Sequence, residues 1–91
     1  MDAYVSQKAK DALRALSSEG PLRPKVLAAR AHLSTVCNEN FMAGMPSTLR
    51  QDMTKAMSGD INDDARNVAS LLRNLISGIN RESRKRYAEA A

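Results

Sequence analysis

The sequence predicts an all-α fold: a compact bundle of about four helices, of which the third is short, with no sheet. Three observations support this fold class. Apolar residues recur at spacings of three and four in four segments, which gathers them on one face of a helix. Glycine and proline separate those segments. No segment shows the two-residue alternation of a half-buried strand or the signal of a tight hairpin turn.

The first helix is expected over residues 2–19. Its apolar stripe is formed by Val5, Ala9, Ala12, Leu13 and Leu16. The stretch "EGPLRP" ends this helix, because Gly20 suits the position just past a helix C-terminus and Pro21 cannot continue the hydrogen-bond ladder.

The second helix is expected to begin near Pro24, since proline suits the first turn of a helix, and to run to Asn40 or Met42. Its apolar stripe is formed by Leu22, Val26, Ala29, Leu33, Val36 and Cys37. Gly44 and Pro46 within "MAGMPS" break the helical pattern.

A shorter third helix is expected to end at Ser58 and Gly59. Either Ser47 or Thr48 is its expected N-cap, and Thr48 has the capping-box spacing to Gln51. The residues expected to face the core are Leu49, Met53, Ala56 and Met57.

The fourth segment carries the strongest helical pattern. In "DINDDA", Asp60 or Asn62 is the expected N-cap, and Asp63 and Asp64 fall in the first turn, beside the positive end of the helix dipole. Gly78 lies inside the pattern at a cost of about 1 kcal/mol relative to alanine, so it marks either a close helix approach or the end of the stable helix. The stripe is formed by Ile61, Ala65, Val68, Leu72, Leu75 or Ile76, and Ile79.

The chain is long enough for one domain. We expect residues 1–80 to form the helical domain and residues 81–91 to form a basic C-terminal helix end or tail, which carries +2 of the net charge of +4. The apolar residues include 14 alanines and only 22 residues of Val, Ile, Leu, Met and Phe. The core is therefore small, and a small core is often completed by a second copy or another protein.

The composition indicates an intracellular protein. A single cysteine excludes an intrachain disulfide and is typical of a reducing compartment. No apolar run reaches the roughly 18 residues of a membrane span, and "MDAYVSQKAK" lacks the apolar stretch of a signal peptide. We expect a soluble, cytoplasmic protein without a membrane partner.

No catalytic, metal or cofactor site is expected. The single histidine and the single cysteine, His32 and Cys37, fall about 140° apart on a helix and do not converge. Cys37 lies in the apolar stripe, so it reads as a small buried residue and not as a nucleophile. "DINDDA" lacks the glycine and the glutamate of a calcium-binding loop, and helix capping explains its polar residues.

Methionines gather around the break after the second helix, and the favoured interpretation is that they fill the core where two helices meet. Methionine adapts its shape and is also frequent on binding surfaces, so an exposed protein-binding patch is the alternative interpretation. The candidate partner-binding residues are Phe41, Met42, Met45, Met53 and Met57.

Residues 26–41, "VLAARAHLSTVCNENF", resemble the helix-turn-helix of DNA-binding regulators. His32 takes the turn position that usually holds glycine, and Asn38 takes a usually apolar position. The resemblance implies that Asn38 and Asn40 would face base edges, with Glu39 repelling phosphate between them. The residues that match the motif are Leu27, Ala28, Ala31, Leu33 and Ser34.

The stretch "RESRKRY" contains four cations, Arg81, Arg84, Lys85 and Arg86. On a helix they spread around the rod instead of forming one stripe, which favours a solvated helix end over a dedicated phosphate-binding surface. They remain candidates for an electrostatic rim or for nucleic-acid contact.

These observations favour a non-catalytic interaction protein, such as a regulator, inhibitor or assembly factor. It would bind a protein partner, or a second copy of itself as a homodimer, through apolar helix faces. The alternative is a nucleic-acid-binding protein that uses the basic C-terminal tail and the helix-turn-helix-like region.

Overall fold

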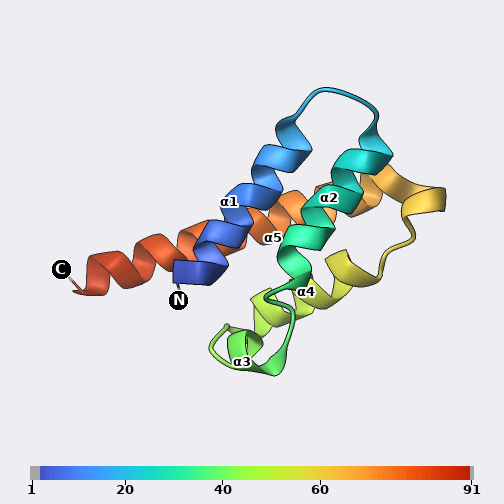
Figure 1. Ribbon diagram of the computed structural model, residues 1–91. Coiled ribbons are helices and arrows are strands. Elements are labelled where there is room, and N and C mark those ends of the chain that lie inside the picture. Colours follow the sequence, from blue (N-terminus) through green and yellow to red (C-terminus); the bar gives the residue numbers. More distant parts are fainter. Residues whose placement is uncertain (1–2, 91) are drawn as a thin grey trace.

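The computed structural model describes the backbone of residues 3–90 and the side chains of residues 3–85. The described chain consists of helices joined by short turns and loops, with no strand, and the prediction of an all-α bundle is confirmed (Figure 1). The helices are α1 (Ala3–Ser17), α2 (Leu22–Ser34), α3 (Glu39–Met42), α4 (Ser47–Ser58) and α5 (Ile61–Ala90).

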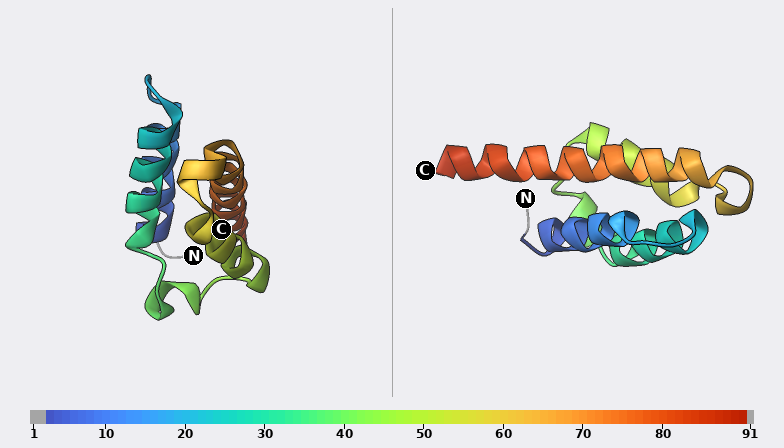
Figure 2. Two further views of the ribbon diagram at one scale, coloured as in Figure 1. Left: turned by 90° about the vertical axis from the view of Figure 1, so that its right-hand side faces the viewer. Right: turned by 90° about the horizontal axis from the view of Figure 1, so that it is seen from above.

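The helices form two layers, which Figure 2 shows from two directions. One layer is the antiparallel pair α1 and α2, and the other is formed by α4 and the long helix α5. The α1–α2 pair crosses α5 at an angle and packs on it through both helices (Figure 1). The start of α1 therefore lies beside the C-terminal half of α5.

The core lies between the two layers. It is built mainly from the predicted stripes: α1 buries four of its five predicted residues, and Leu13 alone of that stripe is exposed. No polar or charged side chain among the described residues is buried. The α5 residues in the core are Val68, Ala69, Leu72, Leu75, Ile76 and Ile79.

The prediction of one continuous second helix is wrong, because α2 ends at Ser34. The hydroxyl groups of Ser34 and Thr35 donate to backbone carbonyls three residues earlier, each at 2.8 Å, which competes with continued helix. Asn38 then caps a new helix, since its side-chain oxygen accepts a hydrogen bond from the backbone N–H of Phe41. This break creates α3, so the described chain has five helices where about four were predicted.

The N-cap predicted for the helix that ends at Ser58 is also wrong. α4 begins at Ser47 with Pro46 as its N-cap residue, and no side chain caps it. Thr48 lies inside the first turn and cannot form the predicted capping box with Gln51. The predicted end at Ser58 is confirmed.

Arg30 of α2 ties the two layers together at the end of α4. Its Nη1 donates to the carbonyl of Gly59 at 2.7 Å, and its Nη2 donates to the carbonyl of Met57. A guanidinium at this position satisfies carbonyls that lack helical partners and meets the negative end of the α4 dipole. The periodicity of α2 does not single out this residue.

Candidate functional site

The solvent-exposed side of α5 carries only basic and neutral polar residues between Arg66 and Lys85. At about 100° per residue, these exposed positions fall within an arc of about 120°. The cations are Arg66, Arg73, Arg81, Arg84 and Lys85, and the neutral residues are Asn67, Ser70, Asn74 and Ser77. The cations share one side because the opposite arc of the helix is buried against α1, α2 and α4.

Lys10 of α1 extends this surface across the groove between α1 and α5. The groove is lined by Ser6, Lys10, Asn80, Ser83 and Arg84. The hydroxyl oxygens of Ser6 and Ser83 are 2.5 Å apart and hold the two helices together at its base. We define the basic face as Lys10 of α1 with the five exposed cations of α5.

Among the described side chains, no carboxylate balances the basic face. Glu82 is the single acidic residue between Asp64 and Lys85, and it lies half-buried, about 100° around the helix from Arg81. Within the described part of the chain, none of the six cations forms an ion pair, and Arg84 makes only a 3.5 Å hydrogen bond to the Asn80 carbonyl. The positive charge of the face is therefore exposed to solvent, and none of the described carboxylates neutralises it.

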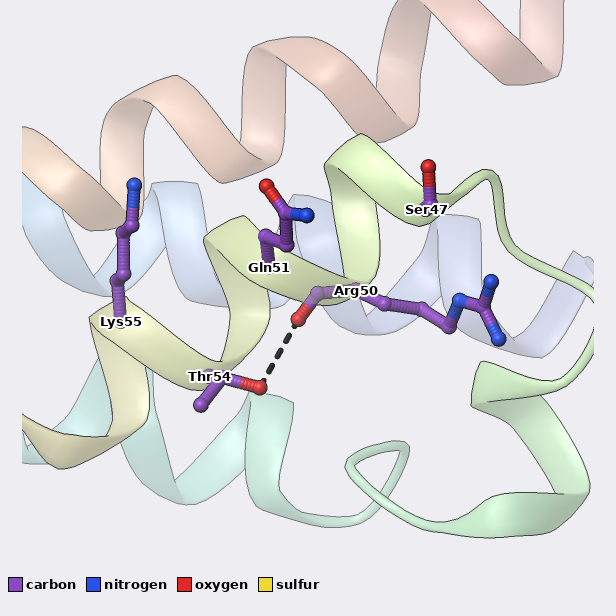
Figure 3. Close-up of a pocket in the computed structure, with 5 residues that line it drawn as sticks. All are labelled: Ser47, Arg50, Gln51, Thr54 and Lys55. Atoms are coloured by element: carbon purple, nitrogen blue, oxygen red, sulfur yellow. Dashed lines mark hydrogen bonds between the residues drawn. The ribbon is translucent and has the colours of Figure 1, made fainter.

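A second shallow hollow lies on the exposed side of α4. In Figure 3, Ser47, Gln51 and Lys55 point toward α5, while Arg50 points along α4 toward α3. Thr54 donates from its hydroxyl to the Arg50 carbonyl at 3.0 Å, so its side chain is held against its own helix. The hollow therefore carries two cations, of which Lys55 points toward α5 and Arg50 toward α3.

Three of the exposed acidic residues that the structure describes, Asp60, Asp63 and Asp64, lie at the start of α5, directly before Arg66. Asp60 accepts hydrogen bonds from the backbone N–H groups of Asn62 and Asp63, at 2.8 and 3.4 Å. These two bonds lower the pKa of Asp60 below its ordinary value, and Arg23 contributes in the same direction. This selects Asp60 from the two predicted N-caps, and it leaves α5 with an acidic beginning and a basic body.

The candidate protein-binding residues separate into two groups. Met45 and Met53 lie in the core, with 4% and 0% of their surface exposed, so they offer no contact surface in this structure. Phe41, Met42 and Met57 are half-buried at the edge of the core. Phe41 stacks on Tyr4 of α1, with ring centroids 5.4 Å apart, which explains how α3 is held against the bundle.

The candidate rim residues Arg81, Arg84 and Lys85 are all exposed and belong to the basic face. The side chain of Arg86, the fourth predicted cation, lies outside the described side chains. Arg66 and Arg73 were not predicted, because the sequence analysis placed the basic stretch only at residue 81 and beyond. The signal that could have found them is the lack of any acidic residue from 65 to 81.

The region that resembles a helix-turn-helix does not have the geometry of that motif. α2 continues through His32, where the turn was expected, and ends at Ser34. The helix that follows has four residues, which is too short to lie along a DNA groove as a recognition helix. Asn38 is occupied in capping this helix.

His32 and Cys37 are both half-buried, and neither forms a side-chain hydrogen bond with the other. Among the described residues, no three His, Cys, Asp or Glu side chains gather in a group that could hold a metal ion. None of the helices in the described part of the chain combines the length and apolar character needed to cross a membrane.

Comparison of the chain with models of known protein families, with curated proteins and with solved structures finds no match.

Proposed function

We propose that this protein is a non-catalytic interaction protein that binds a polyanionic partner through the basic face. The single observation that carries the proposal is the basic face itself: its six cations on α1 and α5 form no ion pair with the described residues, and no exposed acid lies among them. An extended surface of one charge sign attracts partners of the opposite sign and accelerates their encounter.

The energetics of the isolated protein support this reading. Cations three or four residues apart on a helix, such as Arg81, Arg84 and Lys85, repel one another and lower helix stability by a few tenths of a kcal/mol per pair, about 0.2–0.5 kcal/mol. The chain has ten acidic residues, and none of those described forms an ion pair with this face. A negatively charged partner would reduce this repulsion between the cations, so the charge pattern of the face favours binding of such a partner.

A polyanion column tests the proposal. We expect the protein to be retained on immobilised heparin and to elute at a salt concentration well above that of a face variant, Arg66→Gln/Arg73→Gln/Arg81→Gln. A control variant, Lys8→Gln/Arg23→Gln/Lys25→Gln, has the same net charge but loses cations of α1 and α2 instead. Elution of the two variants at the same salt would contradict the proposal.

A second candidate keeps the leading interpretation of the sequence, a protein partner bound through an apolar helix face. The observation that favours it is on α2, where Leu27 is 56% exposed although it is a large apolar side chain. Its exposed neighbours on the same side of α2 are Pro24, Ala28 and Ala31. These spacings of three and four form an apolar strip on the outer side of the α1–α2 layer.

Sedimentation at low and high protein concentration tests this candidate in its homodimer form. Leu27→Lys should abolish any concentration-dependent dimer, whereas Leu13→Lys, at the other exposed leucine, should leave it intact. A monomer at all concentrations would exclude the homodimer.

A further inference from the structure

We propose that the partner of the basic face is double-stranded DNA, bound through its phosphate backbone without base readout. The inference rests on the proposed function and names the chemical class of its partner.

The length of the face suits a duplex. From Arg66 to Lys85 the helix rises about 28 Å, which is two thirds of the 42 Å longest dimension of the molecule. Successive arginines are about 10 and 12 Å apart along the axis, from Arg66 to Arg73 and from Arg73 to Arg81. The major groove of a DNA duplex is about 12 Å wide and its phosphates line both edges, so a helix of this length meets several phosphates at once.

The neutral residues of the face match phosphate contacts. Asn67, Ser70, Asn74 and Ser77 lie between the arginines and are all exposed. Asparagine and serine side chains, like those of arginine and lysine, are among the groups that hydrogen-bond to DNA phosphates. The face therefore offers charge and hydrogen-bond donors along its whole length.

The same composition argues against an acidic protein as the partner. The centres of protein–protein interfaces are apolar and rich in aromatic residues. Between Arg66 and Lys85, no exposed residue of α5 is apolar or aromatic. A protein interface centred here would have no apolar anchor.

Single-stranded nucleic acid fits less well, because its recognition depends on aromatic side chains that stack on bases. The aromatic side chains that the structure describes, Tyr4 and Phe41, stack on each other between α1 and α3 and do not belong to the face. A duplex presents its phosphates and shields its bases, which is what a face without aromatic residues can use.

The acidic start of α5 limits how the duplex can lie. Asp60, Asp63 and Asp64 are exposed at that end and repel phosphate. The duplex is therefore expected to contact the part of α5 from Arg66 onward, with Lys10 and Arg84 on either side of the α1–α5 groove.

Fluorescence anisotropy with a labelled duplex of mixed sequence, measured between about 50 and about 200 mM salt, tests the inference. With six phosphate contacts, log Kd should change with log salt by a slope near 5, which is about a 1,000-fold loss of affinity over that range. The face variant should lower the slope to about 3, and the charge-matched control variant should keep it near 5. Far-ultraviolet circular dichroism checks that both variants retain their helices.

Each remaining outcome decides the inference. Retention on heparin without duplex binding would overturn it and leave the proposed function standing, whereas failure on both would overturn both. Equal slopes for the two variants would show that only net charge matters and would overturn it. Tighter binding of a single strand, of duplex RNA or of polyglutamate than of duplex DNA would also overturn it. Weaker binding of a duplex with a scrambled sequence would show that the protein reads bases and would overturn that part of the inference.

Discussion

Gly78 of α5 lies directly against Leu49 of α4: a Cβ atom at Gly78 would fall 2.5 Å from Leu49 Cδ2. Gly78 is buried and has helical neighbours on both sides, so its role is not to end the helix. Of the two meanings that the sequence allowed for this glycine, the close approach of two helices is the one that the structure shows. The contact sets the distance between the helices of one layer.

We expect Gly78→Ala to destabilise the protein by about 1 kcal/mol. The overpacking cost of about 1–3 kcal/mol exceeds the helix-propensity gain of about 1 kcal/mol that alanine brings. Urea unfolding followed by circular dichroism measures the change. Ser77→Ala, at the exposed neighbouring position, should be neutral or slightly stabilising.

The same substitution made in a Leu49→Ala background should have the opposite sign. Without the Leu49 side chain, the alanine at position 78 has no clash and keeps its propensity gain, so a double-mutant cycle should show a favourable coupling of about 1–2 kcal/mol. A coupling near zero would mean that Leu49 turns aside without cost.

Arg30→Gln should lower the free energy of unfolding by about 1.5–3 kcal/mol, the usual range for hydrogen bonds to a charged group. The glutamine is too short to reach the carbonyls of Met57 and Gly59 that the guanidinium binds. Arg14→Gln, at an exposed α1 position without a side-chain hydrogen bond, is the matched control and should change stability little. If Arg30→Lys kept full stability, the two-pronged geometry would not matter.

The capping carboxylate of Asp60 should make the start of α5 sensitive to acid. Because the folded protein lowers the pKa of Asp60 below its ordinary value of 3.8, the ionised form stabilises the fold above that pH. This contribution is lost as pH falls through the lower, folded-state pKa. NMR titration of the Asp60 carboxyl carbon should give a pKa below 3.8. A pKa at or above 3.8 would contradict the capping role of this carboxylate.

A disulfide between positions 6 and 83 should form readily. The two serine oxygens are 2.5 Å apart, close to a sulfur–sulfur bond of about 2.05 Å. In a Cys37→Ala background, oxidation of Ser6→Cys/Ser83→Cys closes a loop of 77 residues and should stabilise the fold by about 4 kcal/mol. Ser6→Cys/Ser77→Cys, whose second position faces solvent, should not form the bond under the same conditions.

The periodic stripes predicted the long helices well, because burial on one side of a helix leaves a direct trace in the spacing of apolar residues. The spacing of apolar residues does not indicate the break after Ser34. Leu33, Val36 and Cys37 continue the helical spacing across it, and Val36 is buried although it lies in a turn. Hydrogen bonds between the side chains of Thr35 and Asn38 and the backbone cause the break. The spacing of apolar residues carries no information about such bonds.

The site was only partly predictable for a related reason. Arg81, Arg84 and Lys85 drew attention because they are dense in sequence. Arg66 and Arg73 are isolated there and join them only because α5 is one continuous helix after its kink at Asp64. The methionines show the reverse case. Met45 looks like part of a loop in the sequence, yet the packing of the bundle buries it, whereas the expected inward position of Met53 is confirmed.

The share of the core that α5 supplies has a consequence for the order in which the chain folds. α5 contributes six of the 18 buried apolar residues, and they all come after residue 67. During synthesis, α1 and α2 can pair as soon as they leave the ribosome, but their inner surface stays uncovered until those residues emerge. At about 5–20 residues per second, that interval lasts a few seconds. The nascent hairpin is therefore most exposed to aggregation before the segment from Val68 to Ile79 has been made.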